Sequence, residues 1–406
     1  MSVLAASYYR LGRLRRTVGE VLNPAEIFVS PQGTPGGIGT RSMPLDSYPA
    51  AVAAVQSGGV VRILDTTQAN PWQVYPGSQA KSYTLRSGTD GEKAYVTGCA
   101  TVTPTWTSLG DGRWTTTDIP GTPRRITFID LTDNHIGTAP HPEWLNPNTS
   151  NAADVAANTW HMASGTLTVR LLDDQAPSGR VLYDLGNENE LRYWLSTSGV
   201  TLSVYDLNLV GARGGLSASE GQIYAQDCTL SYSANLNVSG AAANGPRFDP
   251  AVYAGYIETL RVELIRGLGD GGSINADGYM RLVDTLVKGY SDEGVSSHNR
   301  SLLEMVGGVL EFSGTNGSAC VHDSETVCDG VTVRYNGFSP IATLGQAITA
   351  ALWWAGSSGT WPNGPTGAYQ NCLIELNYCP ATNINPSSTA LDGGGNTVQN
   401  NDQPLP

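Results

Sequence analysis

The sequence predicts an all-β fold in which short strands form the successive coils of a parallel β-solenoid. Beyond residue 200, β-rich runs recur. Polar or glycine residues inside these runs lie 21, 32, 25, 24, 22 and 41 residues apart, at Asp206, Asp227, Thr259, Asp284, Gly308, Gly330 and Asn371. A repeat in the low twenties, made of strands and turns, is typical of a solenoid. Glycine is frequent, with 48 in 406 residues, and only 15% of residues are charged, which suits a fold of many turns.

The two long intervals are interpreted as enlarged coils. The interval of 32 residues is read as one coil with an insertion, and that of 41 as two coils or as one coil enlarged around Trp353, Trp354 and Trp361. Leucine-rich repeats have a similar period, but their LxxLxLxxN motif is present only in fragments. Residues one period apart are therefore expected to lie above one another, about 4.8 Å apart.

Residues 1–25 are predicted to contain a short helix. Leu4, Tyr8, Leu11, Leu14 and Val18 recur at helical spacing, with four arginines mostly off this stripe. We interpret the segment as an attachment or trimerisation helix. A helix that packs on the body of the same protein and a membrane-surface helix are the alternatives.

The next elements are predicted to open the solenoid. Residues 26–30 form a strand, followed by a Gly/Pro loop, and Ser47 caps a helix over Tyr48–Gln56 that ends at Ser57–Gly59. Residues 60–64 form the next strand. The solenoid domain is assigned to residues 26–400.

The middle of the chain is predicted to carry inserted hairpins. Ser82–Arg86 and Ala94–Thr97 look like a first coil, whereas residues 100–200 contain irregular, tryptophan-bearing segments. Residues 160–172 are predicted to form a hairpin with its turn at Ala163–Gly165. Regular coils are expected over residues 200–400.

Composition excludes several classes of protein. The net charge of −13 does not supply the cationic face that sequence-independent nucleic-acid binding requires. No run of about 18 apolar residues exists that would span a membrane. The six cysteines form no CxxC pair, so zinc binding is not expected and most are predicted to be small buried side chains. The N-terminus shows no secretory signal.

Four segments carry a resemblance to right-handed parallel β-helix proteins of the pectate-lyase-like superfamily. IFVSPQGTPGGIGTRSMPLDSYPAAVAAVQSGGVVRIL, residues 27–64, resembles their entry, and YTLRSGTDGEKAYVTGC resembles the strands that follow. TWHMASGTLTVRLLDDQAP is similar to a hairpin inserted in carbohydrate-active members. SDEGVSSH, residues 291–298, resembles a D-D-G-x-S-x-H stretch of bacterial and phage β-helix proteins, with Glu293 in place of the second Asp.

Among these families the chain resembles bacteriophage tailspike and tail-fibre depolymerases most. The resemblance implies a homotrimer on the phage tail, attached to tail or baseplate proteins through residues 1–25, that binds and cleaves a bacterial surface polysaccharide outside the cell. The alternatives are a non-catalytic tail adhesin, a structural virion protein and a bacterial polysaccharide lyase of the same fold that is secreted by a non-classical route. No nucleic acid and no membrane insertion are expected.

Two series of polar residues are predicted to form ladders on neighbouring coils. The first contains Asp270, Asp292 and Asn316, each closely followed by glycine, and the second contains Asp277, His298 and His322, with Asp323 adjacent. Together with Glu293 they are expected to line a polysaccharide groove. The alternative is that these residues only hold turns through backbone hydrogen bonds.

The residue types of these ladders suit the cleavage of glycosidic bonds. Paired carboxylates supply a proton donor and a base or nucleophile, so Asp292, Glu293, Asp270 and Asp277 are candidate catalytic groups. His298 would instead serve as the base of a lyase. Substrate binding is assigned to Lys288, Arg300, Asn316, His322 and Asp323. Trp353, Trp354 and Trp361 either form an aromatic sugar platform or pack in the core or at a subunit interface. No cofactor is expected, although Asp270, Asp292 and Glu293 offer oxygen ligands of the kind that calcium prefers.

Overall fold

The computed structural model describes most of the chain between residues 26 and 401. The described ranges are 26–67, 71–74, 78–97, 100–101, 105–118, 125–128, 144–147, 151–157, 159–171, 174–177, 181–184, 193–195, 198–210, 215–231, 236–239, 255–265, 270–290, 292–337, 350–355, 364–384 and 388–401. The helix predicted within residues 1–25 lies outside them, as do Cys99, Ser291 and Trp361.

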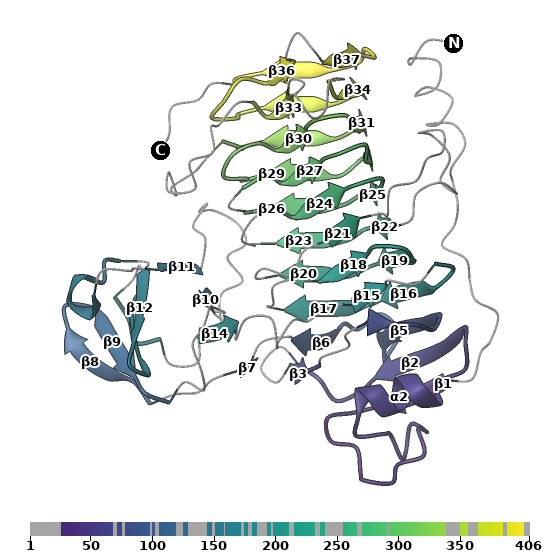
Figure 1. The fold of residues 1–406 in the computed structure, drawn as a ribbon, viewed down its shortest axis with the longest axis vertical. Helices are drawn as coiled ribbons and strands as arrows, with labels where there is room; N and C mark the ends of the chain where they lie inside the picture. Colours follow the sequence, from purple (N-terminus) through teal and green to yellow (C-terminus); the bar gives the residue numbers. More distant parts are fainter. Residues whose placement is uncertain are drawn as a thin grey trace.

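Three long sheets stack their strands as rungs along the molecule (Figure 1). The first sheet has 11 described strands: β1 (Glu26–Val29), β2 (Gly59–Ile63), β5 (Tyr83–Ser87), β16 (Thr201–Tyr205), β19 (Gln222–Gln226), β22 (Tyr256–Leu260), β25 (Tyr279–Val283), β28 (Leu302–Val306), β31 (Glu325–Asp329), β34 (Thr366–Gln370) and β37 (Thr389–Asp392).

The second sheet has 10 described strands: β3 (Trp72–Gln73), β6 (Ala94–Thr97), β17 (Leu207–Val210), β20 (Thr229–Ser231), β23 (Glu263–Ile265), β26 (Leu286–Lys288), β29 (Val309–Glu311), β32 (Thr332–Arg334), β35 (Leu373–Glu375) and β38 (Thr397–Gln399). The third sheet has nine described strands: β4 (Ser78–Gln79), β15 (Tyr193–Leu195), β18 (Leu216–Ala218), β21 (Leu236–Ser239), β24 (Gly272–Asn275), β27 (Val295–Ser297), β30 (Ser318–Cys320), β33 (Leu352–Trp354) and β36 (Thr382–Ile384).

Each coil gives one strand to each sheet, and neighbouring coils pair in parallel. Strand β16 pairs with β19, β17 with β20 and β18 with β21. Buried apolar side chains from all three sheets fill the interior as one cluster that includes Leu85, Val204, Leu264 and Trp354. This arrangement agrees with the predicted all-β parallel solenoid.

The corner between the first and second sheets is very short. From β16 to β35 it contains one or two residues. The first of them has a positive φ, between 47° and 68°, at Asp206, Asp227, Arg261, Asp284, Gly307, Gly330 and Asn371, and Gly308, the second residue of its corner, has a positive φ of 85° as well. The residues that occupy the position of Asp206 in the later coils are therefore Arg261 and Gly307. The spacing in the sequence had suggested Thr259 and Gly308 for this position. Glu258 pairs with Arg281, Arg281 with Glu304 and Glu304 with Val327, so these coils are 23 residues long.

The two corners that flank the third sheet vary in length. Residues 240–255 separate β21 from β22, whereas residues 298–301 make the same connection between β27 and β28. Both long intervals of the sequence are single enlarged coils, because β19 pairs with β22 and β31 with β34. The interpretation of residues 330–371 as two coils is wrong.

An additional sheet separates β6 from β15. It has eight described strands: β7 (Ala100–Thr101), β8 (Thr107–Gly110), β9 (Arg113–Thr116), β10 (Arg125–Phe128), β11 (Trp144–Pro147), β12 (Thr159–Ala163), β13 (Thr166–Arg170) and β14 (Val181–Asp184). A short 3-10 helix covers Ala152–Asp154. Strands β12 and β13 form an antiparallel hairpin with Ser164 and Gly165 in its turn, as the sequence predicts.

Helix α2 (Tyr48–Ala54) packs at the first coil. The Ser47 hydroxyl accepts a hydrogen bond of 3.4 Å from the Ala50 amide, which confirms the predicted cap, and the helix ends two residues before Gln56. The five described cysteines are buried, as the sequence predicts for most of them. Among the described helices, none is both long and apolar enough to cross a bilayer.

Candidate active site

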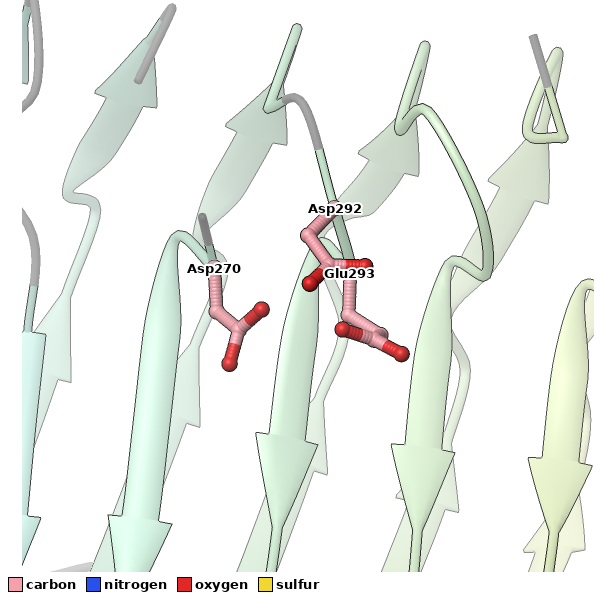
Figure 2. A group of neighbouring side chains, drawn as sticks. All are labelled: Asp270, Asp292 and Glu293. Atoms are coloured by element: carbon pink, nitrogen blue, oxygen red, sulfur yellow. The ribbon is translucent and has the colours of Figure 1, made fainter. Parts of the chain in front are cut away.

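Three carboxylates converge at the corner between the second and third sheets. Asp270 precedes β24, and Asp292 and Glu293 precede β27 one coil later. One oxygen from each carboxylate lies within 4.8 Å of the others. Figure 2 shows Asp270 on one coil and the other two side chains on the next, with neighbouring carboxylates. We call these three residues the acid cluster.

A stack of glycines lets the coils approach closely beside the acid cluster. A Cβ on Gly271 would lie 2.7 Å from the carbonyl oxygen of Gly294, and a Cβ on Gly294 would lie 2.6 Å from that of Gly317. The Gly294 amide donates to the carbonyl of Asn316 at 3.0 Å. The glycine after each acidic or amide residue is therefore what permits the side chains of successive coils to stack here.

Three polar side chains bind the acid cluster. The Ser296 hydroxyl donates to Asp270 Oδ2 at 2.5 Å, and the Thr315 hydroxyl donates to Asp292 Oδ1 at 3.0 Å. The Asn316 amide donates to Glu293 Oε1 at 3.4 Å. Asn316 thus contacts a candidate catalytic group from the following coil. Ser296 and Thr315 were missed by the sequence reasoning, although Ser296 lies within SDEGVSSH.

Burial and mutual repulsion favour protons on the acid cluster. The side chain of Glu293 is buried, and burial together with the negative charges of Asp270 and Asp292 raises its pKa to about 10. Burial also raises the pKa of Asp270, with the charge of Asp292 adding to the shift. A carboxylic acid that stays protonated at neutral pH is suited to donate a proton.

Glu293→Gln should change how stability depends on pH. The folded-state pKa of Glu293, about 10, lies above its ordinary value of 4.5. The stability that protonation contributes is therefore complete below the ordinary value and is lost as the pH rises toward 10. Glutamine does not titrate, so we expect the variant to melt above wild type at about pH 8.5 and near it at about pH 5.

Circular dichroism melting curves across this pH range measure the effect. Glu220→Gln, at an exposed glutamate, is the matched control and should follow wild type throughout. A difference between Glu293→Gln and wild type that does not vary with pH would show that Glu293 ionises alike in the folded and unfolded chain.

The first predicted ladder is displaced by one residue. Gly272 pairs with Val295 and Val295 with Ser318, so the residue two positions before each strand forms the ladder. Asp270, Glu293 and Asn316 therefore stack, while Asp292 aligns with Thr315. Asp292 remains in the acid cluster because it neighbours Glu293.

The second predicted ladder is wrong in composition. Tyr279 pairs with Leu302 and Leu302 with Glu325, which aligns Asp277 with Arg300 and Asp323. This corner joins the third sheet to the first, at the opposite end of the strands from the acid cluster. Asp277 binds Arg300, whose Nη2 lies 2.7 Å from Asp277 Oδ2, and is not part of the acid cluster.

The two histidines lie together at this second corner. Their ring centroids are 6.2 Å apart. Burial, with the charge of His322 adding to it, lowers the pKa of His298 to about 4, against an opposing contribution from Asp292. His298 is therefore neutral at pH 7 and a weak base.

The two cations assigned to substrate binding are engaged in ion pairs. Lys288 Nζ lies 3.1 Å from Glu311 Oε1 and 5.1 Å from the centroid of the Phe312 ring. Arg300 binds Asp277, as described above. The structure thus does not bring either cation into the acid cluster.

The acid cluster also has the donor chemistry of a cation site. Calcium takes six to eight oxygen ligands, and the cluster offers three carboxylates, one of which accepts a hydrogen bond from Ser296. Protons and calcium compete for the same oxygens. Protonation of Glu293, whose pKa is raised by burial and by the neighbouring carboxylates, would therefore oppose calcium binding here.

Comparisons with known proteins give only distant likenesses. No family model matches the sequence, and no curated protein matches it significantly. A solved structure described as "The complex structure of XylC with xylose" matches with a TM-score of 0.48 at 10% identity, over 88% of this chain and 70% of that one.

Two further solved structures are similar at comparable or lower levels. One described as "Glycoside hydrolase" has a TM-score of 0.44 at 10% identity, over 93% of this chain and 96% of the other. The GH136 lacto-N-biosidase from Eubacterium ramulus has a TM-score of 0.20 at 8% identity, over 94% and 68%. Likenesses at this level bear on neither substrate nor reaction.

Proposed function

We propose that this protein binds and hydrolyses a polysaccharide of the bacterial cell surface. The observation that supports this most is the acid cluster, in which one buried carboxyl with a raised pKa lies beside two other carboxylates. Glycoside cleavage requires a protonated acid and a second carboxylate on opposite sides of the scissile bond. The cluster offers both within one corner of two coils.

In the proposed reaction Glu293 is the general acid. Its carboxyl proton goes to the glycosidic oxygen as the bond from that oxygen to the anomeric carbon breaks. Asp292 attacks the anomeric carbon and forms a glycosyl ester. Water, which gives a proton to Glu293, now a carboxylate, then adds to the anomeric carbon as the ester bond to Asp292 breaks. Oxygens within 4.8 Å of one another are closer to the separation of about 5 Å typical of retaining enzymes than to the wider inverting one.

Hydrolysis is favoured over elimination by the charges around the site. Elimination on a uronate needs a base and cations that neutralise the substrate carboxylate. His298 has a lowered pKa of about 4, and the assigned cations Lys288 and Arg300 are paired with Glu311 and Asp277. A lyase of the same fold is therefore the less favoured candidate.

Incubation of the purified protein with host surface polysaccharide tests the reaction. We expect new reducing ends and shorter chains, without the ultraviolet absorbance of a conjugated double bond. His298→Ala should retain activity within about tenfold, because hydrolysis does not use the imidazole. New absorbance, or loss of activity in His298→Ala well beyond this, would instead identify a lyase. Binding without cleavage would identify an adhesin.

The finer assignments rest on the sequence resemblance. We propose a right-handed parallel β-helix, since parallel crossovers are right-handed in about 98% of cases. We also propose a tailspike-like homotrimer on the phage tail that acts outside the host cell, with residues 1–25 as the attachment to tail or baseplate proteins. Light scattering that gives the mass of a monomer at micromolar concentration would exclude the trimer.

A further inference from the structure

The hydroxyl of Thr315 holds one carboxylate oxygen of the acid cluster from the following coil. Thr315 lies three residues before β30 and Asp292 three residues before β27, so the two occupy the same position in adjacent coils. Thr315 Oγ1 donates to Asp292 Oδ1 at 3.0 Å, and the Thr315 amide donates to the Asp292 carbonyl oxygen at 3.2 Å. The backbone bond already joins the two coils here, and the hydroxyl adds a second bond that is made to the carboxylate.

Thr315 is too deeply buried to be a contact for a polysaccharide. It is 4% exposed, whereas part of the Asp292 surface beside it remains exposed. The next residue, Asn316, is arranged in a similar way. Its Oδ1 accepts from the Ala350 amide at 3.0 Å, which directs its own amide group to Glu293 Oε1, 3.4 Å away. Two adjacent residues of one coil thus donate to two adjacent carboxyl groups of the coil before it.

We infer that Thr315 is a positioning residue for the nucleophile, Asp292. The inference rests on the proposed function and adds which oxygen attacks: Thr315 holds Oδ1, and Oδ2 forms the bond to the anomeric carbon. As Oδ2 gives an electron pair to that carbon, the glycosidic bond breaks and the proton of Glu293 goes to the leaving oxygen. Oδ1 becomes the carbonyl oxygen of the glycosyl ester and still accepts from the Thr315 hydroxyl.

The hydroxyl matters because three carboxyl groups share this corner. Neighbouring carboxyl groups compete for protons, and a hydroxyl donor favours the charged form of the carboxylate to which it donates. Thr315 therefore favours the negative charge on Asp292, beside the proton donor Glu293. It also fixes the direction of the attacking carboxylate, and misplacement of a reacting group by 1 Å can cost a factor of about 10².

Substitutions at Thr315 separate this role from a contribution to folding. Purified bacterial capsular polysaccharides and lipopolysaccharides are first screened for one that wild type shortens, and that glycan is used throughout. Thr315→Val is nearly isosteric but has no donor, so we expect kcat to fall at least about tenfold while KM stays within about threefold of wild type. Thr315→Ser keeps the hydroxyl and should have a kcat within about threefold of wild type.

Thr229→Val is the matched control. The Thr229 hydroxyl likewise donates to a carboxylate of the following coil, Glu263 Oε2 at 2.7 Å, but on the second sheet. This variant should keep the kcat of wild type. Melting curves verify the fold of every variant, and Thr315→Ala, compared with Thr315→Ser, serves in the same assay if the valine variant does not fold.

A double-mutant cycle tests whether Thr315 acts through Asp292. In the Asp292→Asn background there is no nucleophile to position, so Thr315→Val should change the residual rate by less than about threefold. Losses that multiply in the double variant would show that Thr315 acts independently of Asp292 and would overturn the inference.

The outcomes distinguish this inference from the proposed function. Wild-type kcat in Thr315→Val, with Asp292→Asn inactive, would overturn the positioning role alone. Equal losses in the valine and serine variants, or a raised KM at unchanged kcat, would overturn it as well. If wild type shortens no polysaccharide of the screen, or Asp292→Asn cleaves as well as wild type, the proposed function fails and the positioning role with it.

Discussion

Asp292→Asn and Glu293→Gln are expected to lower the rate of polysaccharide cleavage by a factor of about 10² or more each. Glutamine at position 293 has no acidic proton for the leaving oxygen, and asparagine at position 292 is a poor nucleophile. Both amides are nearly isosteric with the acids that they replace. Reducing-end assays on host polysaccharide, with melting curves alongside, give the rate and verify the fold.

Asp284→Asn is the matched control for these two variants. Asp284 lies in the same coil, exposed at the corner between the first and second sheets, and asparagine also tolerates its φ of 47°. We expect wild-type activity from it. If Asp292→Asn and Glu293→Gln also cleave as well as wild type, the acid cluster only holds turns, and any catalytic site lies elsewhere, for example between subunits.

Gly308→Ala is expected to cause the largest loss of stability, about 2–5 kcal/mol in the free energy of unfolding. Gly308 has a φ of +85°, and a Cβ there would lie 2.3 Å from the carbonyl oxygen and 2.7 Å from the amide nitrogen of Thr285. Backbone atoms of the adjacent coil cannot give way as a flexible side chain would. The alanine variant therefore adds overpacking to an unfavourable conformation.

Gly330→Ala isolates the conformational part of this effect. Gly330 has a φ of +68°, but its nearest neighbour to a new Cβ is 3.9 Å away, so we expect a loss of only about 1–2 kcal/mol. Chemical denaturation of both variants measures the difference. Equal losses would mean that the coils separate enough near Gly308 to accept a methyl group.

The repeat could be predicted from the sequence because stacked coils impose a common length on the chain. The register within each coil could not. The β-rich run that contains Asp206 is in fact two strands of different sheets, β16 and β17, joined at Asp206. One residue with positive φ turns the chain between sheets, and the apolar pattern continues almost uninterrupted across it.

The acid cluster was predicted only in part, because its composition also depends on the register within each coil. Asp270 and Asp292 are 22 residues apart, whereas coils in this region are 23 residues long, so Glu293 is the true partner of Asp270. Asp277 and the histidines share the next corner instead. Which of two adjacent tryptophans faces outward depends on strand parity, and the doublet Trp353–Trp354 does not reveal that parity.

The unequal lengths of the corners determine where the solenoid can accept inserted residues. The corner between the first and second sheets admits only one or two residues between β16 and β35, so insertions there would break the solenoid. The corners on either side of the third sheet accept long segments, including the whole eight-stranded sheet before β15. Mutation can therefore rebuild the surroundings of the acid cluster without disturbing the interior.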